Sequence, residues 1–311
     1  MKTASPLLSL CIPTYNRGGI LRQALDHLVA LPVFNESDDI EVVISDNAST
    51  DETQEVGESF VARYPDRIHY YRNERNVVDI NFGLVIDRAS GVFRKLANDT
   101  LLHTDEGIRH MLDAIHRYQD EKPILCFQCL PSKRPDRRFH TLDALWRERS
   151  YFTTWIAEFG LWADDFTSVA DFTRAESTHL VQVDFLLRLM SRKKDAVVVE
   201  DVFFTGIGRK NVGAGGVNVA RVFGRDYLDL LVPYVASGEI DKSTFNREKW
   251  RVFRYNILNT FIITTPGFLF PKTGFVKHLF KHYKWKWYFW GAVPFAWGAR
   301  ILSTIRNAID I

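Results

Sequence analysis

Three short polar segments hold the residues in the first hundred positions that could do chemistry. They are residues 13–17, 46–51 and 98–100, and each follows an apolar run typical of a buried β-strand. Ligands of open α/β sheets bind beyond the carboxyl ends of the strands. Turn formation would explain each polar segment singly. The three together predict one binding site at one edge of a sheet.

The elements that must position these segments alternate along the chain. We expect strands at residues 7–12, 40–45, 68–71 and 92–97, separated by helical patterns, with a further helix over about 104–118 and another over about 173–192. Strands separated by helices of this length predict βαβ units and a mostly parallel sheet flanked by helices.

A glycine-rich segment, residues 206–216, contains Arg209 and Lys210. It does not match the dinucleotide-binding fingerprint, because residue 211 is Asn and no strand–turn–helix context surrounds it. Two interpretations stay open: a flap over a bound anion, and a plain flexible loop.

Composition excludes several classes of protein. The 311 residues are 46% hydrophobic and 25% charged, with a net charge of +2, which is typical of a globular protein and argues against nucleic acid as a partner. Cys11, Cys126 and Cys129 are too few for a disulfide framework and predict a reducing, cytoplasmic location. No apolar run reaches the roughly 18 residues that a membrane span needs.

The charge is distributed unevenly. Residues 249–309 contain no Asp or Glu but ten Lys and Arg, together with many aromatic residues. We expect an α/β domain over 1–235 and a helical, aromatic and basic extension over 236–311. Residues 272–300 could contact an anionic membrane surface, because Trp and Tyr favour the headgroup layer and Lys favours anionic lipid. Alternatively, the aromatic face of this segment packs on the α/β domain and the lysines are solvated; this face consists of Val276, Leu279, Phe280, Tyr283, Trp287 and Trp290.

The first 115 residues or so resemble a known family. The string Leu8-Ser-Leu-Cys-Ile-Pro-Thr-Tyr-Asn-Arg17, with Val42-Val-Ile-Ser-Asp-Asn-Ala-Ser-Thr-Asp51, is similar to the start of the family 2 glycosyltransferases, which have the GT-A fold. Asn76, Asp79-Ile-Asn81 and Ala89-Ser-Gly-Val-Phe93 resemble the next segment of that family. The Asp-x-Asn motif is most similar to the branch with abequosyltransferases and related O-antigen or capsule enzymes.

The resemblance implies a fold, an activity and partners. Residues 1–115 would be the nucleotide-sugar half and 116–235 the acceptor half of a GT-A domain. The protein would move a sugar from a nucleotide-sugar donor to a saccharide or polyprenyl-linked acceptor, with inversion and with Mg²⁺ or Mn²⁺ as cofactor. It would work on the inner face of the cytoplasmic membrane.

The resemblance also implies roles for individual residues. Asp99 would bind the metal ion; in the family two or three consecutive acids stand where this chain has Asn98-Asp99-Thr100. The residues expected to bind the nucleotide-sugar are Pro13, Thr14, Tyr15, Asn16, Arg17, Asp46, Asn47, Asp79, Asn98, Arg209 and Lys210.

An inverting transferase also needs a general base near the acceptor hydroxyl. The family usually places an acid near the start of a helix in the second half of the domain, which here begins around residues 175–179. His179 and Glu176 are the candidates, with Asp184 further along the helix. The Glu200-Asp201 pair and the Asp164-Asp165 pair stay open as alternatives.

Two alternative functions are a sugar nucleotidyltransferase and a non-catalytic scaffold. A sugar nucleotidyltransferase has a similar sheet, but it opens with a glycine-rich loop that ends in a basic residue, which residues 13–17 do not form. A non-catalytic scaffold for polysaccharide assembly at the membrane would account for the reduced acidic motif around Asp99.

Overall fold

The computed structural model describes residues 5–128, 134–206, 217–258, 271, 273–292, 294 and 298. Contacts within the chain divide it into two compact units. Unit 1 comprises Met1–Leu145 and Phe152–Val212, and unit 2 comprises Trp146–Tyr151 and Gly213–Ile311. The division after residue 235 that the sequence suggests stays a prediction.

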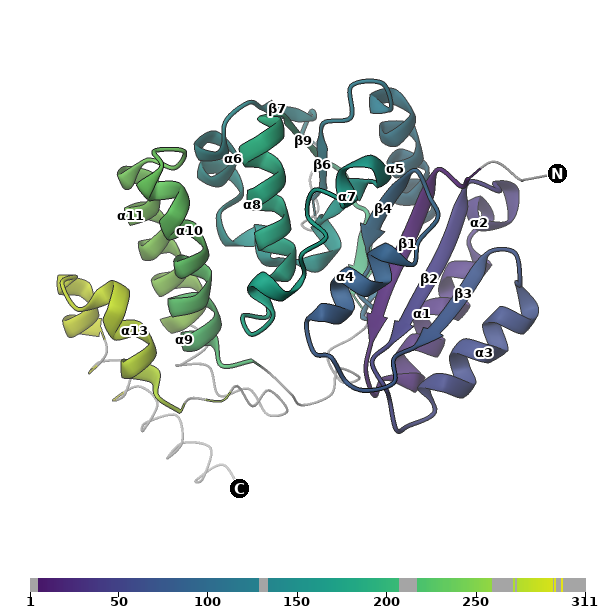
Figure 1. The fold of residues 1–311 in the computed structure, drawn as a ribbon, viewed down its shortest axis with the longest axis horizontal. Coiled ribbons are helices and arrows are strands. Elements are labelled where there is room, and N and C mark those ends of the chain that lie inside the picture. Colours follow the sequence, from purple (N-terminus) through teal and green to yellow (C-terminus); the bar gives the residue numbers. More distant parts are fainter. Residues whose placement is uncertain are drawn as a thin grey trace. The chain divides into compact units, whose positions relative to one another are not determined.

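Unit 1 is built on a twisted sheet with the strand order β3-β2-β1-β4-β8 (Figure 1). The first four strands in this order are parallel, and β8 pairs antiparallel with β4 at the edge. The predicted mostly parallel α/β fold is therefore confirmed. The strands of this sheet are β1 (Leu8–Thr14), β2 (Ile40–Asp46), β3 (Ile68–Arg72), β4 (Phe93–Leu96) and β8 (Gly160–Trp162).

Both faces of this sheet are covered, and all residues of β1 and β2 except the half-buried Pro13 are buried. Leu10 and Val42 face a core that contains Leu21 and Leu25 of α1 and Phe60 of α3. On the other face lies α4, which contacts β1 and β2. Figure 1 shows α1 and α3 behind the sheet and α4 in front of it. The helices that follow the first three strands are α1 (Gly18–Ala30), α2 (Pro32–Glu36), α3 (Thr53–Arg63) and α4 (Ile80–Asp87).

The remainder of unit 1 extends this sheet with smaller ones. Its elements are β5 (Leu101–His103), α5 (Asp105–Tyr118), β6 (Ile124–Phe127), β7 (Arg137–Phe139), α6 (Leu142–Arg149, which continues into unit 2), α7 (Ala163–Phe166), α8 (Val181–Lys193), β9 (Ala196–Val199) and β10 (Phe204–Gly206). The strands form one sheet in the order β6-β9-β7 and a β10-β5 pair. Helix α5 begins as the sequence predicts, because the Thr104 hydroxyl caps it by accepting from the Gly107 N–H at 3.0 Å.

The helix predicted over 173–192 begins later than expected. A short 3₁₀ turn, Thr173–Ala175, is separate, and α8 begins at Val181 after His179, whose φ is +61°. A residue in the left-handed region cannot continue a right-handed helix. Apolar spacing did not reveal this break, because Ala175 on the preceding turn and Leu180 are both buried.

A lysine lies in the core of unit 1. Lys95 of β4 is fully buried, and its ammonium donates to the backbone carbonyls of Leu96, at 3.1 Å, and of Ala157. The ammonium also lies 4.8 Å from the centre of the Phe204 ring. Carbonyl dipoles and a ring face supply the polar partners that a buried charge requires. Lys95 thereby joins β4, which leads to residues 98–100, to the turn at residue 157.

Unit 2 is helical. Its elements are α9 (Val219–Arg221), the π-helical η5 (Val222–Asp226), α10 (Tyr227–Ala236), α11 (Lys242–Arg251), the π-helical η6 (Val252–Leu258) and α13 (Phe275–Tyr283). The Tyr227 hydroxyl accepts from the Trp146 indole at 3.1 Å and donates to buried Glu248 at 2.8 Å. Among the described residues, no helix combines the length and the apolarity that crossing a membrane requires.

Candidate active site

The ends of the central strands lie side by side. In the parallel register Thr14 pairs with Asp46, and Asp46 pairs with Arg72. On the other side of β1, the Ala97 N–H donates to the Cys11 carbonyl at 2.7 Å, which continues the β1–β4 pairing toward residues 98–100. The structure therefore brings the three predicted polar segments together at one sheet edge.

Asp46, at the end of β2, is fully buried and organises the loop that follows it. Its carboxylate accepts from the Ser49 N–H at 3.0 Å, from the Ser49 hydroxyl, from the Tyr70 hydroxyl at 2.6 Å and from Arg72 at 3.3 Å. Burial, followed by the bond to Asp46, raises the pKa of Tyr70 well above its usual value. Asp46 thus shapes the loop, and direct contact between its carboxylate and a nucleotide stays a prediction.

Asn47 fixes a second loop against the first. Its side-chain amide donates to Asn76 at 2.9 Å and to the Val78 carbonyl at 3.2 Å. Its carbonyl oxygen accepts from Asn73 at 3.1 Å and from the Val77 N–H at 2.8 Å. Residues 73–78 are therefore held at the end of β2.

Asp99 lies at the centre of the edge and is 2% exposed. One carboxylate oxygen accepts from the Arg17 guanidinium at 2.7 Å, and the other accepts from the Thr14 hydroxyl at 3.2 Å. Burial raises the pKa of Asp99 above its usual value, although Arg17 and Thr14 oppose the shift. Asn98 is turned into its own loop, where its carbonyl oxygen accepts from the Thr100 N–H at 3.0 Å and hydroxyl at 2.7 Å.

The segment after β1 joins the other loops and presents one ring to solvent. Asn16, with φ at +50°, donates its N–H to the Ser49 hydroxyl at 2.8 Å and accepts from the Thr50 N–H at 2.7 Å. Pro13 lies within β1 and is half-buried. Tyr15 is 44% exposed. Its ring is therefore available to stack on a planar ligand.

Asp79 pairs with a residue 100 positions away. Its carboxylate accepts from the His179 N–H at 2.7 Å, and its other oxygen lies 3.0 Å from His179 Nδ1. Asp79 is buried, whereas the His179 side chain is 39% exposed. Both sides of this contact hold residues in the left-handed region, Val78 at φ +49° and His179 at +61°. The carboxylate fixes the imidazole in one orientation with Nδ1 facing Asp79, so that Nε2 is the nitrogen that could act on a ligand.

The other candidate bases lie in different environments. Glu176 is exposed. Asp184 is 2% exposed and lies between Arg188 at 2.8 Å and Arg174 at 3.3 Å. Burial raises the pKa of Asp184, while the two guanidinium groups oppose the shift. This environment favours a structural role for Asp184.

The paired acids that the sequence left open are also engaged in ion pairs. Glu200 is buried against Arg137. Asp201 lies 2.7 Å from His110, Asp164 pairs with Lys122, and Asp165 lies 2.6 Å from Lys193. Arg209 and Lys210 lie outside the described residues, as do the glycine-rich segment from residue 207 onward and Cys129.

Sequence comparison identifies the family. The profile of "Glycosyl transferase family 2" matches residues 9–172, which is more than half of the chain and contains all three polar segments. The chain belongs to glycosyl transferase family 2. The resemblance to this family noted in the first 115 residues is confirmed.

Two characterised relatives align with parts of this family 2 glycosyltransferase. It is 43% identical over 86 residues to the abequosyltransferase RfbV of Salmonella typhimurium. This alignment covers 27% of this chain and 25% of the relative. The chain is 39% identical over 97 residues to a validoxylamine A glucosyltransferase of Streptomyces hygroscopicus subsp. jinggangensis, which is 31% of this chain and 21% of the relative. Each alignment thus spans about a quarter or less of the relative's length.

Solved structures share the fold of this glycosyltransferase. The mannosyltransferase PcManGT of Pyrobaculum calidifontis, in complex with GDP-Man and Mn²⁺, superimposes with a TM-score of 0.56 over 82% of this chain and 72% of that one. Residues 1–349 of S. aureus TarS, in complex with UDP-GlcNAc, give 0.54 over 83% of this chain and 76% of that one. Both are 14% identical in sequence, so the likeness shows the GT-A fold.

Several residues that build the edge escaped the sequence analysis. Tyr70 and Arg72 hold Asp46. Asn73 donates to the buried Asn81 and accepts from Arg88. Parallel pairing of β2 and β3 would have predicted the position of Arg72, because the end of β3 must then lie beside the end of β2. No spacing rule links Asp79 to His179.

The environments of Asp184 and Glu176 make a testable distinction. Asp184→Ala would leave two guanidinium groups without their acid and should lower the free energy of unfolding by about 3 kcal/mol. Glu176→Ala, at an exposed position, should change it by less than about 0.5 kcal/mol. Urea unfolding measures both. Equal effects of the two substitutions would contradict the structural role of Asp184.

Proposed function

We propose that this glycosyltransferase transfers a sugar from a nucleotide-sugar donor, bound at the tips of β1, β2 and β4, to a saccharide or lipid-linked acceptor of a bacterial surface polysaccharide. The observation that carries the proposal is the meeting of Thr14, Arg17 and Asp99 beside the exposed ring of Tyr15. The partial match to an abequosyltransferase supports the polysaccharide setting. Inversion at the anomeric carbon belongs to this proposal.

The donor set suits a divalent ion held jointly with a diphosphate. Asp99 supplies a hard carboxylate oxygen, and Mg²⁺ or Mn²⁺ is commonly held by one or two carboxylates plus phosphate oxygens. Among the described residues, no group of three or more His, Cys, Asp or Glu side chains could hold a metal ion alone. The diphosphate must therefore complete the site. A structural neighbour in complex with GDP-Man and Mn²⁺ supports this choice. When bound, the ion would neutralise charge on the leaving diphosphate.

Arg17 would change its partner when the metal ion and the donor bind. Its guanidinium now neutralises Asp99, and its side chain is 40% exposed, so it can turn outward without breaking core packing. A cation at Asp99 would displace it by like-charge repulsion. The released guanidinium has the planar fork that matches phosphate oxygens, and Arg17 would then bind the donor diphosphate.

Donor binding gives the first test of this function. Thermal unfolding in the presence of UDP-, GDP-, CDP- and dTDP-sugars should reveal one nucleotide that stabilises the protein, by about 2.7 kcal/mol at a hundredfold excess over Kd. Mn²⁺ should increase that stabilisation in the wild type and not in Asp99→Asn. Nucleotide-sugar hydrolysis should likewise be stimulated by Mn²⁺ and lost in Asp99→Asn.

The matched control for this experiment is Asp113→Asn, which makes the same change at an exposed position of α5. It should behave as the wild type does. If no donor stabilises the protein and none is hydrolysed, the proposed transfer is wrong and the non-catalytic scaffold is favoured. Stimulation by Mn²⁺ that survives in Asp99→Asn would contradict the metal role of Asp99.

We further propose His179 as the general base, positioned by Asp79. The imidazole receives its orientation from a buried carboxylate, and the His179 side chain is 39% exposed. An acid that accepts from Nδ1–H favours the tautomer whose Nε2 can accept a proton. Of the other candidates, Glu176 accepts no such positioning contact in the described structure, and Asp184 is committed to two arginines.

Hydrolysis kinetics test the base, with water in place of the acceptor hydroxyl. His179→Gln should lower kcat at least about a hundredfold with little change in KM, since proton transfer contributes ~10²–10⁴-fold. Asp79→Asn should lower kcat less and alter the pH–rate profile, because the imidazole loses its fixed tautomer. Glu176→Gln serves as the control. Unchanged kcat in His179→Gln would remove this assignment.

The proposed location is the cytoplasmic face of the membrane, where lipid-linked acceptors would be available. In unit 2, Trp285, Trp287 and Trp290 are 85%, 82% and 56% exposed, and Phe280 is 46% exposed. The aromatic face expected from the sequence is thus divided, because Leu279 and Tyr283 are buried in unit 2 while these rings face outward. Exposed tryptophans beside lysines are typical of interfacial membrane contacts.

Vesicle flotation tests this contact. Replacing Trp285 and Trp287 together by Ser should lower the affinity for anionic vesicles at least about tenfold, because each ring loses apolar burial of roughly 1.5–3 kcal/mol. Trp155→Ser, at a position 41% exposed in unit 1, is the matched control. Equal flotation of the double variant and the wild type would refute membrane contact through these rings.

A further inference from the structure

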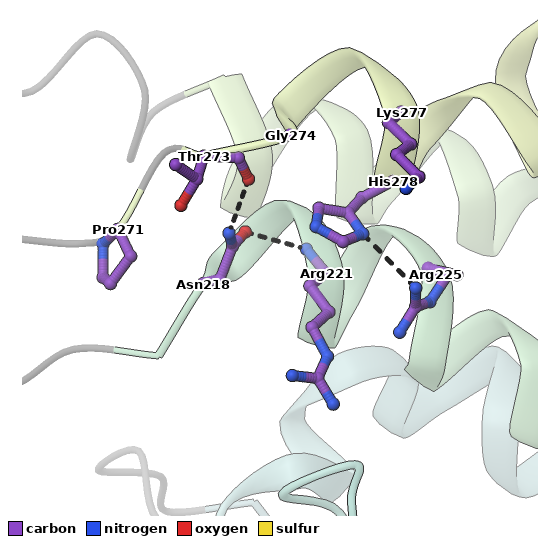
Figure 2. A pocket seen from close by; sticks show the side chains of 8 residues that line it. All are labelled: Asn218, Arg221, Arg225, Pro271, Thr273, Gly274, Lys277 and His278. Atoms are coloured by element: carbon purple, nitrogen blue, oxygen red, sulfur yellow. Dashed lines mark hydrogen bonds between the residues drawn. The ribbon is translucent and has the colours of Figure 1, made fainter.

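Unit 2 contains a pocket of about 490 Å³ that the proposed transfer does not use. It lies between the start of α9 with η5 and the start of α13 (Figure 2). Asn218 joins the two sides, since its amide donates to the Thr273 carbonyl at 2.9 Å and its carbonyl oxygen accepts from the Arg221 N–H at 3.1 Å. We call this site the basic pocket; the residues that line it are Asn218, Arg221, Arg225, Pro271, Thr273, Gly274, Lys277 and His278.

The basic pocket has an excess of positive charge. Arg221, Arg225 and Lys277 line it, and the acid in contact with them is Asp226, which lies 3.2 Å from Arg221 Nε and 2.6 Å from Arg225 Nε. In the part of the chain that the structure describes, Lys277 forms no ion pair. Among the described residues that line or contact the pocket there are thus three cations and one carboxylate, which pairs with two of them. This excess of positive charge is what an anion would balance.

His278 adds a neutral donor. Its Nδ1 lies 3.4 Å from Arg225 Nη1, an N–H that can only donate, so the imidazole proton is on Nε2. Burial, followed by the neighbouring guanidinium of Arg225, lowers the pKa of His278 and keeps the ring neutral. Figure 2 shows the Lys277 side chain close to this ring and the Arg221 guanidinium directed away from it. A tetrahedral oxyanion in the pocket could accept a hydrogen bond from Nε2–H, and the cations that line the pocket would balance its charge.

The start of α13 contributes to the same pocket. Gly274 is the N-cap residue with φ at +68°, and the first turn contains no acid. A Cβ at this position would lie 3.1 Å from His278 Nε2, so glycine both permits the backbone conformation and leaves room beside the ring. The amino end of a helix carries partial positive charge that favours phosphate.

We propose that the basic pocket binds a phosphate group, supplied by a lipid headgroup or by a soluble phosphate. The lipid is favoured, because α13 also exposes Val276 and Phe280, and the Phe280 ring lies 6.4 Å from that of the exposed Trp290. The pocket would bind an anionic group, and the exposed apolar side chains next to it would contact an apolar chain. A lipid with an anionic head has both parts. The choice of a lipid as the source of the phosphate rests on the proposed membrane contact. The phosphate site itself does not depend on that contact.

The test compares two kinds of phosphatidylcholine vesicle with equal surface charge, one containing phosphatidic acid and the other oleate. The wild type should prefer the phosphate-bearing vesicles. Lys277→Gln should lower that affinity about fivefold, the effect of one surface cation, and remove the preference. Arg225→Lys keeps the charge but loses the guanidinium fork, and should also remove the preference. The matched control is Lys281→Gln, one turn along α13, which should weaken binding to both vesicles equally and keep the preference.

A second measurement separates the sources of phosphate. Inorganic phosphate should raise the melting temperature of the wild type above its value in chloride at equal ionic strength, and should not do so in Lys277→Gln. If this occurs while no vesicle binds, the site stands with soluble phosphate as its ligand and the membrane contact fails. If neither phosphate nor the vesicle pair distinguishes Lys277→Gln from Lys281→Gln, the proposed site is wrong. Nucleotide-sugar hydrolysis by the same variants reports on glycosyl transfer separately.

Discussion

The candidate site depends on how the buried carboxylate of Asp46 is satisfied. A charged group without exposure to water must be neutralised by hydrogen bonds or ion pairs. Ser49, Tyr70 and Arg72 meet that requirement, and they come from the following loop and from the neighbouring strand. The same bonds fix the loop that contacts Asn16 and Asn47. The arrangement of the candidate site therefore follows from the hydrogen bonds and the ion pair that one buried acid requires.

The sequence predicted the framework of unit 1 and the position of the site. Apolar runs that end in polar segments define β1, β2 and β4, because strand period and turn-forming residues are local properties. The orientation of the polar groups was not predictable in this way. Asp46 points inward because Tyr70 and Arg72 lie on the next strand, and the Asp79–His179 contact joins residues 100 positions apart. Such contacts depend on tertiary packing that no local pattern contains. The aromatic tail divided between buried and exposed rings for the same reason, since periodicity identifies a face but not what covers it.

In the proposed function, the electrostatics of the edge would let a single acid serve the metal site. Asp99 is buried with a raised pKa, and Arg17 is the more exposed member of its ion pair. One cation can replace another at such a carboxylate with little net change in buried charge. An arginine that is released by this exchange adds positive charge at the place where a leaving diphosphate would develop negative charge.

The left-handed backbone at Val78 and His179 has a mechanical consequence. Each strained non-glycine residue costs of order 1–3 kcal/mol, and the cost is higher for a β-branched side chain such as Val78. Both residues adjoin the single Asp79 carboxylate, and the Asn76 side chain additionally accepts from the Val78 N–H at 2.8 Å. Loss of the carboxylate contact would release the His179 backbone, whereas Val78 would stay held by Asn47 and Asn76. The position of the imidazole thus depends on one carboxylate, while the 76–79 loop keeps its own attachment to the end of β2.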